Sequence, residues 1–229
     1  MPSSTGTSAE LWLIRHGESI GNREQIYQGQ NDLPLSPLGH QQAVLLAERL
    51  TSLQPIQPFS AIYSSDLQRA VQTALPASQA IGLPVIDHSG LREIDVGLWS
   101  GLTFTDIQSR FPEEWAASYP VMDPDRVRGG GESYRQAQER VVHSLQEIAA
   151  SHLGERVLVF FHGGVMQAVL AHIMQLPLPN KRFLQTANTS ISRVRLSSDN
   201  GRLSGLVLGM NDVAHLEQTG QRLSSVGPE

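Results

Sequence analysis

Two histidines in this chain each follow a short apolar run, which places them where chemistry is common in α/β proteins. Residues 11–14 lead into Arg15 and His16, and residues 157–161 lead into His162. Short apolar runs of this kind predict buried strands. The carboxyl ends of neighbouring parallel strands lie at one edge of a sheet, where such proteins bind ligands. We therefore expect His16 and His162 to share one site.

A third charged residue, Arg69, falls in the first turn of a helix predicted to begin at Leu67, with Ser65 or Asp66 as its N-cap. A cation is disfavoured at this end of the helix dipole, so an anion beside Arg69 is one explanation of its position. A surface ion pair between Arg69 and Asp66 is the other. The sequence leaves both open.

A site that combines Arg15, Arg69 and the two histidines is strongly electropositive and suits a phosphoryl group, since guanidinium groups bind phosphate oxygens in bidentate fashion. Phosphoryl transfer needs charge neutralisation, an in-line nucleophile and a proton for the leaving oxygen. A neutral imidazole can be the nucleophile and form a phosphohistidine. Glu93, when protonated, can supply the proton and then activate water. Taken alone, Glu93 also fits simple turn chemistry in a glycine-rich segment.

The composition limits the classes of function. The 229 residues are 40% hydrophobic, enough for a packed core in one domain. The formal net charge of -5 argues against a nucleic-acid binder that works through bulk charge. The absence of cysteine excludes disulfides, thiolate metal sites and cysteine nucleophiles.

Neither a signal peptide nor a membrane span is expected. Residues 1–10 are small and polar, and the most apolar region, residues 157–176, is interrupted by polar residues and glycines that a spanning helix tolerates poorly. We expect a soluble, cytoplasmic protein.

Strands and helices are predicted to alternate. The strands are residues 11–15, 61–64, 84–86, 157–161, 191–196 and 203–208; the helices are residues 37–53, one from 67, 103–111, one that contains 134–149, and 165–174. This order predicts an α/β three-layer sandwich, a mostly parallel central sheet with helices on both faces. We expect a single domain over residues 1–229, with a core at about 10–217, polar tails and a possible lid at 103–131.

Three connecting segments carry further expectations. Residues 20–35 are predicted to be a polar loop that could line a pocket, and residues 198–201 a hairpin turn between two strands. Residues 219–229 are polar and predicted to be disordered.

Taken together, these residues resemble the histidine phosphatase superfamily, also called phosphoglycerate mutase-like. The resemblance spans residues 11–216, and any one of its motifs alone is weak. In order they are Arg15-His16-Gly17 with Ser19 and Asn22, Gln28-Gly29, Ser64-Ser65-Asp66-Leu67 with Arg69-Ala70 and Thr73-Ala74, Glu93 with Gly97, Trp99 and Gly101, Gly130-Gly131-Glu132-Ser133, His162-Gly163-Gly164, and Asn211-Asp212 with His215-Leu216.

The resemblance implies a role for each matching residue. His16 is the nucleophile that becomes phosphorylated, and Glu93 is the general acid/base. The phosphoryl group is bound by Arg15, Arg69 and His162, with a further contact from Asn22, while Gln28, Gly29 and the Gly163 backbone lie at the pocket wall. The resemblance also implies the phosphoglycerate mutase-like fold. It further implies that no metal or other cofactor is needed, because the arginines and His162 take the charge-neutralising role that magnesium has in many phosphoryl-transfer enzymes.

Within this family the sequence favours the phosphatase branch. Mutases carry paired arginines after the acid, whereas residues 93–99 lack them. We expect a histidine acid-type phosphatase, a phosphoric monoester hydrolase acting on a small phosphomonoester such as a phosphosugar or phosphoglycerate-like compound, with neither nucleic acid nor membrane as partner. The oligomeric state is left open.

Three other functions remain open. One is a cofactor-dependent phosphoglycerate mutase, and another is a catalytically silent phospho-ligand binder. A metallohydrolase that uses His16 and His162 with Asp66 or Asp95 is the third, although the usual paired ligand spacing is missing.

The sequence does not name the substrate. Arg110, Arg126 and Arg128 could bind a second acidic group on it, or they could belong to a solvated charged loop.

Overall fold

The computed structural model describes residues 8–118, 123–199 and 202–217. The strands are β1 (Ala9–Arg15), β2 (Ile26–Tyr27), β3 (Ala61–Ser64), β4 (Val85–Asp87), β5 (Leu102–Thr103), β6 (Arg156–Phe161), β7 (Ile191–Asp199) and β8 (Arg202–Asp212). The helices are α1 (Ile20–Arg23), α2 (Pro37–Leu53), α3 (Gln68–Ile81), α4 (Phe104–Arg110), α5 (Pro112–Ser118), α6 (Tyr134–Ser151), α7 (Gly163–Ile173) and α8 (Ala214–Glu217), with 3₁₀ turns η1 (Ser89–Leu91), η2 (Gly97–Trp99) and η3 (Leu178–Phe183).

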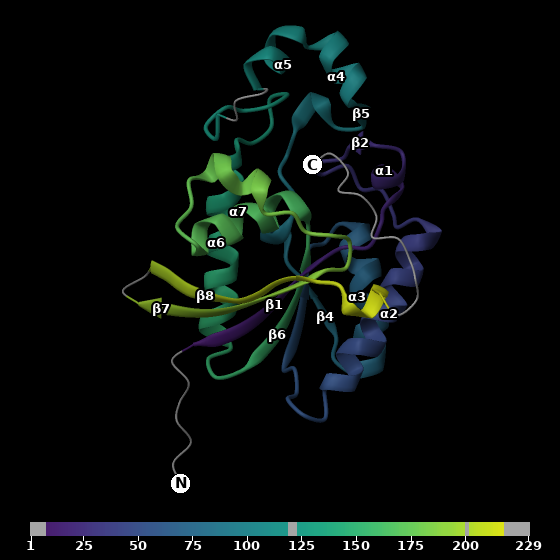
Figure 1. The fold of residues 1–229 in the computed structure, drawn as a ribbon, viewed down its shortest axis with the longest axis vertical. Coiled ribbons are helices and arrows are strands. Elements are labelled where there is room, and N and C mark those ends of the chain that lie inside the picture. The colour runs from purple at the N-terminus through teal and green to yellow at the C-terminus, as the bar shows by residue number, and fades with distance from the viewer. Residues whose placement is uncertain (1–7, 119–122, 200–201, 218–229) are drawn as a thin grey trace.

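The central sheet has six strands in the order β4-β3-β6-β1-β7-β8. Strands β4, β3, β6 and β1 pair in parallel, and β7 runs antiparallel to both β1 and β8. Figure 1 shows α6 and α7 on one side of this sheet and α2 and α3 on the other. The predicted three-layer α/β sandwich with a mostly parallel sheet is therefore confirmed.

Alternate residues of β1 enter two different cores. Leu11 and Leu13 pack in the cluster that includes α6 and α7, and Trp12 and Ile14 pack in the cluster that includes α2 and α3. A strand covered on both faces is apolar at successive positions. This burial is why the sequence shows an unbroken apolar run before Arg15.

Helix α2 begins as predicted. The Ser36 side chain accepts a hydrogen bond from the Gly39 N–H, and Pro37 occupies the first turn. A Cβ on Gly17 would lie 2.7 Å from the Gly39 carbonyl oxygen, so glycine permits this close approach. The contact places the start of α2 against the turn that follows His16.

The predicted helix boundaries were wrong at two places. Helix α3 has Leu67 at its N-cap without a side-chain cap; the Gln68 N–H donates to Asp32 at 2.6 Å, so an acid distant in sequence replaces the local cap. Helix α7 begins at Gly163, two residues earlier than predicted, because Gly163 and Gly164 already have helical backbone.

The polar loop predicted at 20–35 contains secondary structure. Ser19 caps α1 and forms a capping box with Asn22. Ile26 and Tyr27 form β2, which pairs with β5. A short helix and a two-residue strand are too brief to produce a hydrophobic period, so the sequence pattern does not reveal them.

Strands β7 and β8 pair antiparallel, as the predicted hairpin requires, and both are longer than predicted. Residues 200 and 201 of its turn and the predicted disordered tail at 219–229 lie outside the described residues. The single-domain boundaries and the lid at 103–131 stay predictions; within 103–118 the chain forms α4 and α5, which extend beyond the sheet in Figure 1.

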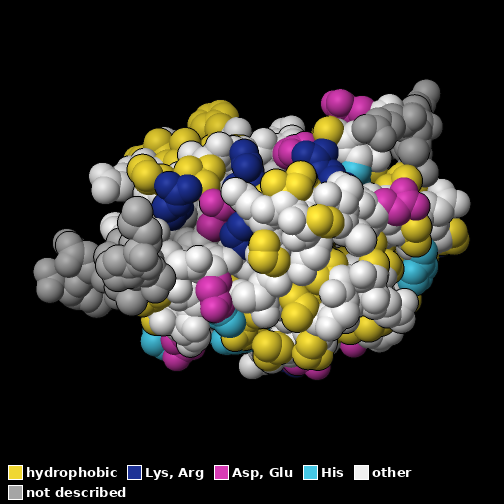
Figure 2. All heavy atoms as spheres, turned by 90° about the horizontal axis from the view of Figure 1, so that it is seen from below, with side chains coloured by type: hydrophobic (Ala, Val, Ile, Leu, Met, Phe, Trp, Pro, Cys, Tyr) yellow, Lys and Arg dark blue, Asp and Glu magenta, His cyan; other side chains and the backbone are white. Residues whose placement is uncertain are grey.

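The end of the molecule drawn in Figure 2 carries charges of both signs. There, Lys and Arg side chains lie among Asp, Glu and apolar side chains. In the part of the chain that the structure describes, no helix is long and apolar enough to cross a membrane.

Candidate active site

His16 lies immediately after β1 and is 1% exposed. Its Nδ1 is 2.6 Å from the Gly17 carbonyl oxygen. Because a carbonyl can only accept, Nδ1 carries the proton, and Nε2 of the neutral ring keeps its lone pair. The His16 backbone is held by hydrogen bonds from its N–H to the Phe161 carbonyl and from the Asn188 side chain to its own carbonyl.

His162 follows β6 and is the N-cap residue of α7. Arg15 and Phe161 are register partners in the parallel β1–β6 pair, so the next residue of each strand extends from the same edge. The His16 and His162 ring centroids are 5.3 Å apart. The prediction that the two histidines lie together is correct.

Ser65 holds the His162 ring. The His162 Nε2 is 2.9 Å from Ser65 Oγ, while its buried Nδ1 has no hydrogen-bond partner among the described residues. The sequence suggested Ser65 only as a helix cap. Its position after β3, the strand beside β6, was the signal for a role in the site.

The two arginines are buried beside the histidines. Arg15 is 0% and Arg69 1% exposed. Arg15 donates to the Thr186 carbonyl at 2.6 Å, and Arg69 donates to the carbonyls of Gly29 and Asn31 at 2.7 and 2.9 Å. Asp66 pairs instead with Arg92, at 2.6 Å, so the alternative of a surface Arg69–Asp66 pair is wrong.

Burial and these cations affect the titration of both rings. Desolvation is the largest cause that holds the pKa of His16 well below its usual 6.5, followed by the charges of Arg69 and Arg15. Desolvation and then Arg69 likewise hold the pKa of His162 well below 6.5. Both imidazoles are therefore neutral at physiological pH, the state that a nucleophilic nitrogen requires.

Glu93 is 4% exposed and is held by backbone N–H groups. Its Oε1 accepts from Ile94 and Val165 at 2.9 and 3.1 Å, and its Oε2 accepts from Gly164 at 2.9 Å. Gly164 and Val165 belong to the first turn of α7, whose unpaired N–H groups favour an acidic partner. The helix that starts after His162 thus fixes Glu93 beside it.

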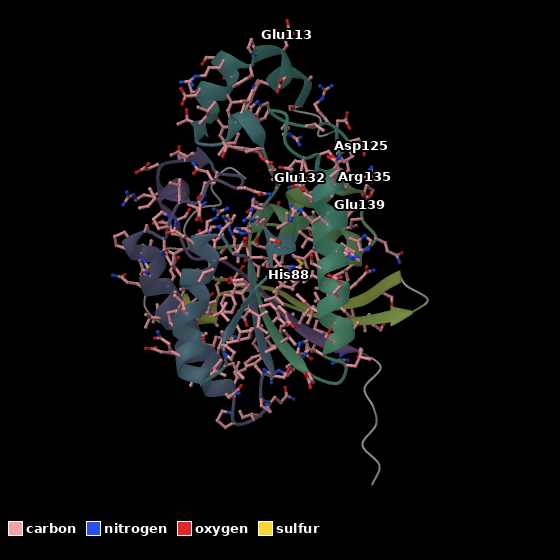
Figure 3. All side chains as sticks on the ribbon, turned by 180° about the vertical axis from the view of Figure 1, so that it is seen from behind. His88, Glu113, Asp125, Glu132, Arg135 and Glu139 are labelled. Carbon is pink, nitrogen blue, oxygen red and sulfur yellow. The ribbon has the colours of Figure 1, made fainter. Side chains whose placement is uncertain are left out.

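The backbone around Glu93 is held by an ion pair between Arg140 and Glu132. Arg140 of α6 bonds to Glu132 through Nε and Nη2 at 2.8 and 2.7 Å, and it donates to the carbonyls of Gly90, Arg92 and Glu93. Figure 3 shows Glu132 near the start of α6. Sequence reasoning missed Arg140 because it lies mid-helix, where an arginine is usually a surface residue.

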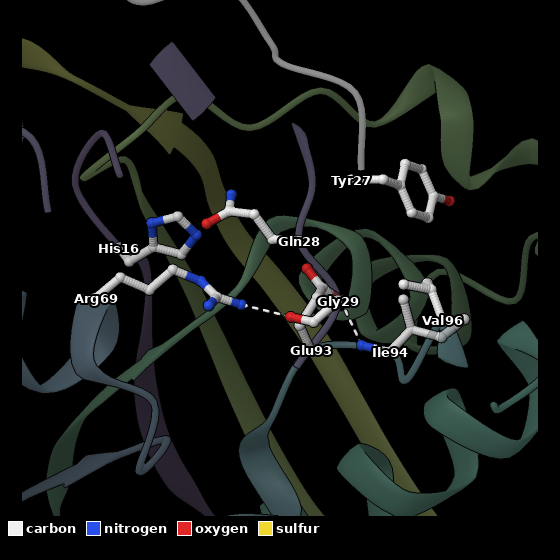
Figure 4. Close-up of a pocket in the computed structure, with 8 residues that line it drawn as sticks. All are labelled: His16, Tyr27, Gln28, Gly29, Arg69, Glu93, Ile94 and Val96. Atoms are coloured by element: carbon white, nitrogen blue, oxygen red, sulfur yellow. Dashed lines mark hydrogen bonds between the residues drawn. The ribbon is translucent and has the colours of Figure 1, made fainter. Parts of the chain in front are cut away.

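A small pocket lies among these groups. It is lined by His16, Tyr27, Gln28, Gly29, Arg69, Glu93, Ile94 and Val96. In Figure 4, His16, Arg69 and Gln28 lie at one side and Tyr27 and Val96 at the other. Of the predicted site residues, His16, Gln28, Gly29, Arg69 and Glu93 thus meet at one pocket.

The other predicted residues lie next to this pocket and are not part of its lining. Arg15 and His162 border His16 as described above, and Gly163 begins α7. Asn22 accepts a hydrogen bond at 3.3 Å from Asn188, which also donates to the His16 carbonyl. Asn22 is therefore connected to the His16 backbone through Asn188, a residue that the sequence analysis did not single out.

Among the described residues, no group of three or more His, Cys, Asp or Glu side chains lies close enough together to hold a metal ion. The cluster that does form pairs two imidazoles and one carboxylate with two guanidinium groups. Such a set can neutralise a phosphoryl group, attack it and exchange protons with its leaving oxygen.

Comparison with known proteins identifies the family of this chain. The model of the histidine phosphatase superfamily (branch 1) matches residues 11–208. A metal-independent phosphoserine phosphatase of Arabidopsis thaliana is 36% identical over 92% of this chain and 84% of its own, and phosphoglycerate mutase-like protein 4 of the same plant is 37% identical over 96% and 92%. The solved structure of mycobacterial glucosyl-3-phosphoglycerate phosphatase is 30% identical with a TM-score of 0.78, covering 90% of this chain and 100% of its own.

Proposed function

The chain belongs to branch 1 of the histidine phosphatase superfamily, and we propose that it hydrolyses the phosphomonoester of a small metabolite through a phosphohistidine at His16. The observation that carries this proposal is the His16 ring itself. Its Nδ1 is engaged by the Gly17 carbonyl, and its Nε2 belongs to a buried neutral ring that lines the pocket with Arg69 and Glu93.

The first step transfers the phosphoryl group to the enzyme. The Nε2 lone pair of His16 attacks phosphorus and forms an N–P bond, while the bond from phosphorus to the ester oxygen breaks. The ester oxygen leaves with its electron pair and takes a proton from the Glu93 carboxyl group. The guanidinium groups of Arg15 and Arg69 neutralise the charge on the phosphoryl oxygens, and the neutral His162 ring can add a hydrogen bond to them.

The second step regenerates the enzyme. Glu93, now a carboxylate, takes a proton from water as the water oxygen attacks phosphorus. The N–P bond breaks, its electron pair returns to Nε2, and inorganic phosphate leaves. A guanidinium has five N–H donors in a fixed plane, so Arg69 can bond to the Gly29 and Asn31 carbonyls and also bind a phosphoryl oxygen.

Relatives named as phosphatases support hydrolysis over phosphate transfer to a second substrate. The mutase remains the second candidate, because another relative is named as phosphoglycerate mutase-like. The narrower assignment to histidine acid-type phosphatases, the roles of the individual residues and the independence from metal stay predictions.

The test is phosphate release in excess EDTA from p-nitrophenyl phosphate and a panel of phosphosugars and phosphoglycerates, with His16→Ala as the blank. Release that the variant lacks supports the proposal. Activity that is lost in EDTA and restored by a divalent metal supports a metallohydrolase. If nothing is hydrolysed, conversion of 3-phosphoglycerate in the presence of 2,3-bisphosphoglycerate identifies a mutase, and failure of that conversion leaves a silent binder.

A further inference from the structure

Two buried cations lie against one aromatic ring, that of Tyr134. Arg128 and Lys181 are 2% and 3% exposed. The guanidinium carbon of Arg128 is 4.4 Å from the Tyr134 ring centroid, and Lys181 Nζ is 3.9 Å from it. Residues 128 and 181 are far apart in sequence, so the fold brings these charges together.

Neither cation forms an ion pair with a described acid. Arg128 Nε and Nη1 are buried without a hydrogen-bond partner in the described part of the chain, and Lys181 Nζ has a long bond of 3.4 Å to Gln167 Oε1. The nearby acids have other partners. Asp125 pairs with Arg135, as their neighbouring positions in Figure 3 indicate, and Glu114 accepts from the Gly129 N–H at 3.3 Å.

Two like charges that lose their hydration without a counter-ion are unfavourable. The face of Tyr134 attracts each cation, but it does not remove the repulsion between them. An anion beside them would compensate both charges at once. The arrangement therefore has the composition of an anion subsite.

Two contacts connect these cations to the catalytic pocket. The Tyr134 hydroxyl is 3.5 Å from that of Tyr27, which lines the pocket. Gly129, next to Arg128 in the chain, packs so closely on the Val96 segment that a Cβ there would lie 2.3 Å from the Val96 carbonyl oxygen. Tyr27 and Val96 lie across the pocket from His16 in Figure 4, so these two contacts place the cations behind the pocket wall that faces the nucleophile.

We propose that Arg128 and Lys181 bind a second anionic group of the substrate, so that the enzyme selects phosphomonoesters with a carboxylate or another phosphate at the end opposite the reacting one. This inference rests on the proposed phosphatase function. Of the three arginines considered from the sequence, Arg110 and Arg126 are exposed and only Arg128 is buried.

The test uses substrates that differ in one anionic group. 3-Phosphoglycerate is compared with glycerol 3-phosphate, and phosphoserine with phosphoethanolamine; fructose 1,6-bisphosphate against fructose 6-phosphate distinguishes a phosphate from a carboxylate. Each pair is measured as a ratio of kcat/KM for the wild type, Arg128→Gln, Lys181→Gln and the exposed control Arg126→Gln.

For at least one pair, we expect the wild type to favour the member with the additional anionic group by about tenfold or more, as for a buried charge-assisted hydrogen bond. Arg128→Gln and Lys181→Gln should each remove most of this preference and leave p-nitrophenyl phosphate hydrolysis within about threefold. Arg126→Gln should keep the preference. A purely structural role predicts equal losses on both members of every pair and contradicts the proposal, as does a wild type without any preference.

A binding measurement separates this inference from the proposed function. In the His16→Ala background, titration calorimetry compares 3-phosphoglycerate with glycerol 3-phosphate and needs no turnover. Tighter binding of 3-phosphoglycerate that Lys181→Gln removes supports the subsite even where no ester is hydrolysed. Equal affinities for the two ligands, together with no preference in the bisphosphate pair, overturn the subsite even where p-nitrophenyl phosphate is hydrolysed. If the Arg128 variant does not fold, the wild-type kcat/KM ratios and the Lys181 variant still support or overturn the subsite.

Discussion

The His16 Nδ1 lies 2.6 Å from the Gly17 carbonyl oxygen of the adjoining residue. This single contact selects the ring tautomer in which Nε2 is unprotonated. It also means that the nucleophile needs no separate base to prepare it, since the neutral ring already carries the reactive lone pair.

The first prediction concerns that tautomer. In the free enzyme, His16 should remain neutral with its proton on Nδ1 from pH 8 down to below 6.5, because burial and the adjacent arginines lower its pKa. Two-bond ¹⁵N–¹H spectra, assigned by comparison with His16→Ala, report the tautomer and the charge directly. A ring that protonates near pH 6.5 would contradict this description of the site.

Replacement of Glu93 tests the proton transfer. Glu93→Gln cannot donate a proton to the leaving oxygen, so kcat for glycerol 3-phosphate should fall by about 10²–10⁴-fold. The loss for p-nitrophenyl phosphate should be much smaller, because p-nitrophenolate leaves without protonation. The ratio of the two losses is the measurement. Equal losses would show that Glu93 is not the acid for the leaving group.

Part of this site was predictable because it follows from strand order. An apolar run that ends at His16 and another that ends at His162 could be placed together once the strands were taken as parallel neighbours, and β1 and β6 do pair in this way. Arg69 and Glu93 were ambiguous when each was taken alone, and it was the resemblance of all the motifs together to the histidine phosphatase superfamily that assigned them to the site.

The remaining contacts depend on tertiary structure that no local pattern encodes. Asp32 caps α3 from a distant loop, and Asn188 holds the His16 carbonyl across 172 positions. Arg128 and Lys181 share a ring contact only because the fold packs both on Tyr134. Hydrophobic periodicity carries no information about such long-range polar contacts.

A prediction about geometry concerns the first turn of α7. In Gly164→Ala, the new Cβ would lie 2.9 Å from Glu93 Oε1, and the carboxylate would have to move. We expect kcat for alkyl phosphates to fall by about tenfold or more, since small displacements of a catalytic group are costly.

The matched control for this change is Gly209→Ala in β8, where the nearest side-chain atom is 3.6 Å away. The control should retain wild-type kcat. A Gly164→Ala enzyme of full activity would show that the position of Glu93 is less restricted than the structure indicates.

Stability should decrease in mild acid, and His215 should contribute. Burial, and then the Arg49 charge, lower the pKa of His215 to about 4, although Asp212 opposes them. Its folded pKa is below the unfolded value near 6.5, so the unfolded chain binds the proton first as the pH falls. The stabilisation is present above pH 6.5 and is lost between 6.5 and about 4, by at most about 1.4 kcal/mol per pH unit.

Urea unfolding at several pH values measures this effect. His215→Gln should lower the free energy of unfolding at pH 7, because the bond to Thr189 is lost. Between pH 6.5 and about 4, the variant should also show a smaller slope of this free energy against pH, by the equivalent of up to one bound proton. His40→Gln changes an exposed histidine that forms no ion pair with a described residue, and it should leave the slope unchanged. The same slope in all three proteins would exclude His215 as a contributor.

The most direct test of the central claim is to trap the phosphoenzyme. Wild-type protein is mixed with a ³²P-labelled phosphomonoester, quenched within milliseconds in denaturing base, where phosphohistidine survives, and mapped by peptide mass spectrometry. We predict label on the peptide that contains His16, located on the imidazole and absent from His16→Ala. Label on another residue, or phosphate release that persists in His16→Ala, would contradict the assignment of His16 as the nucleophile.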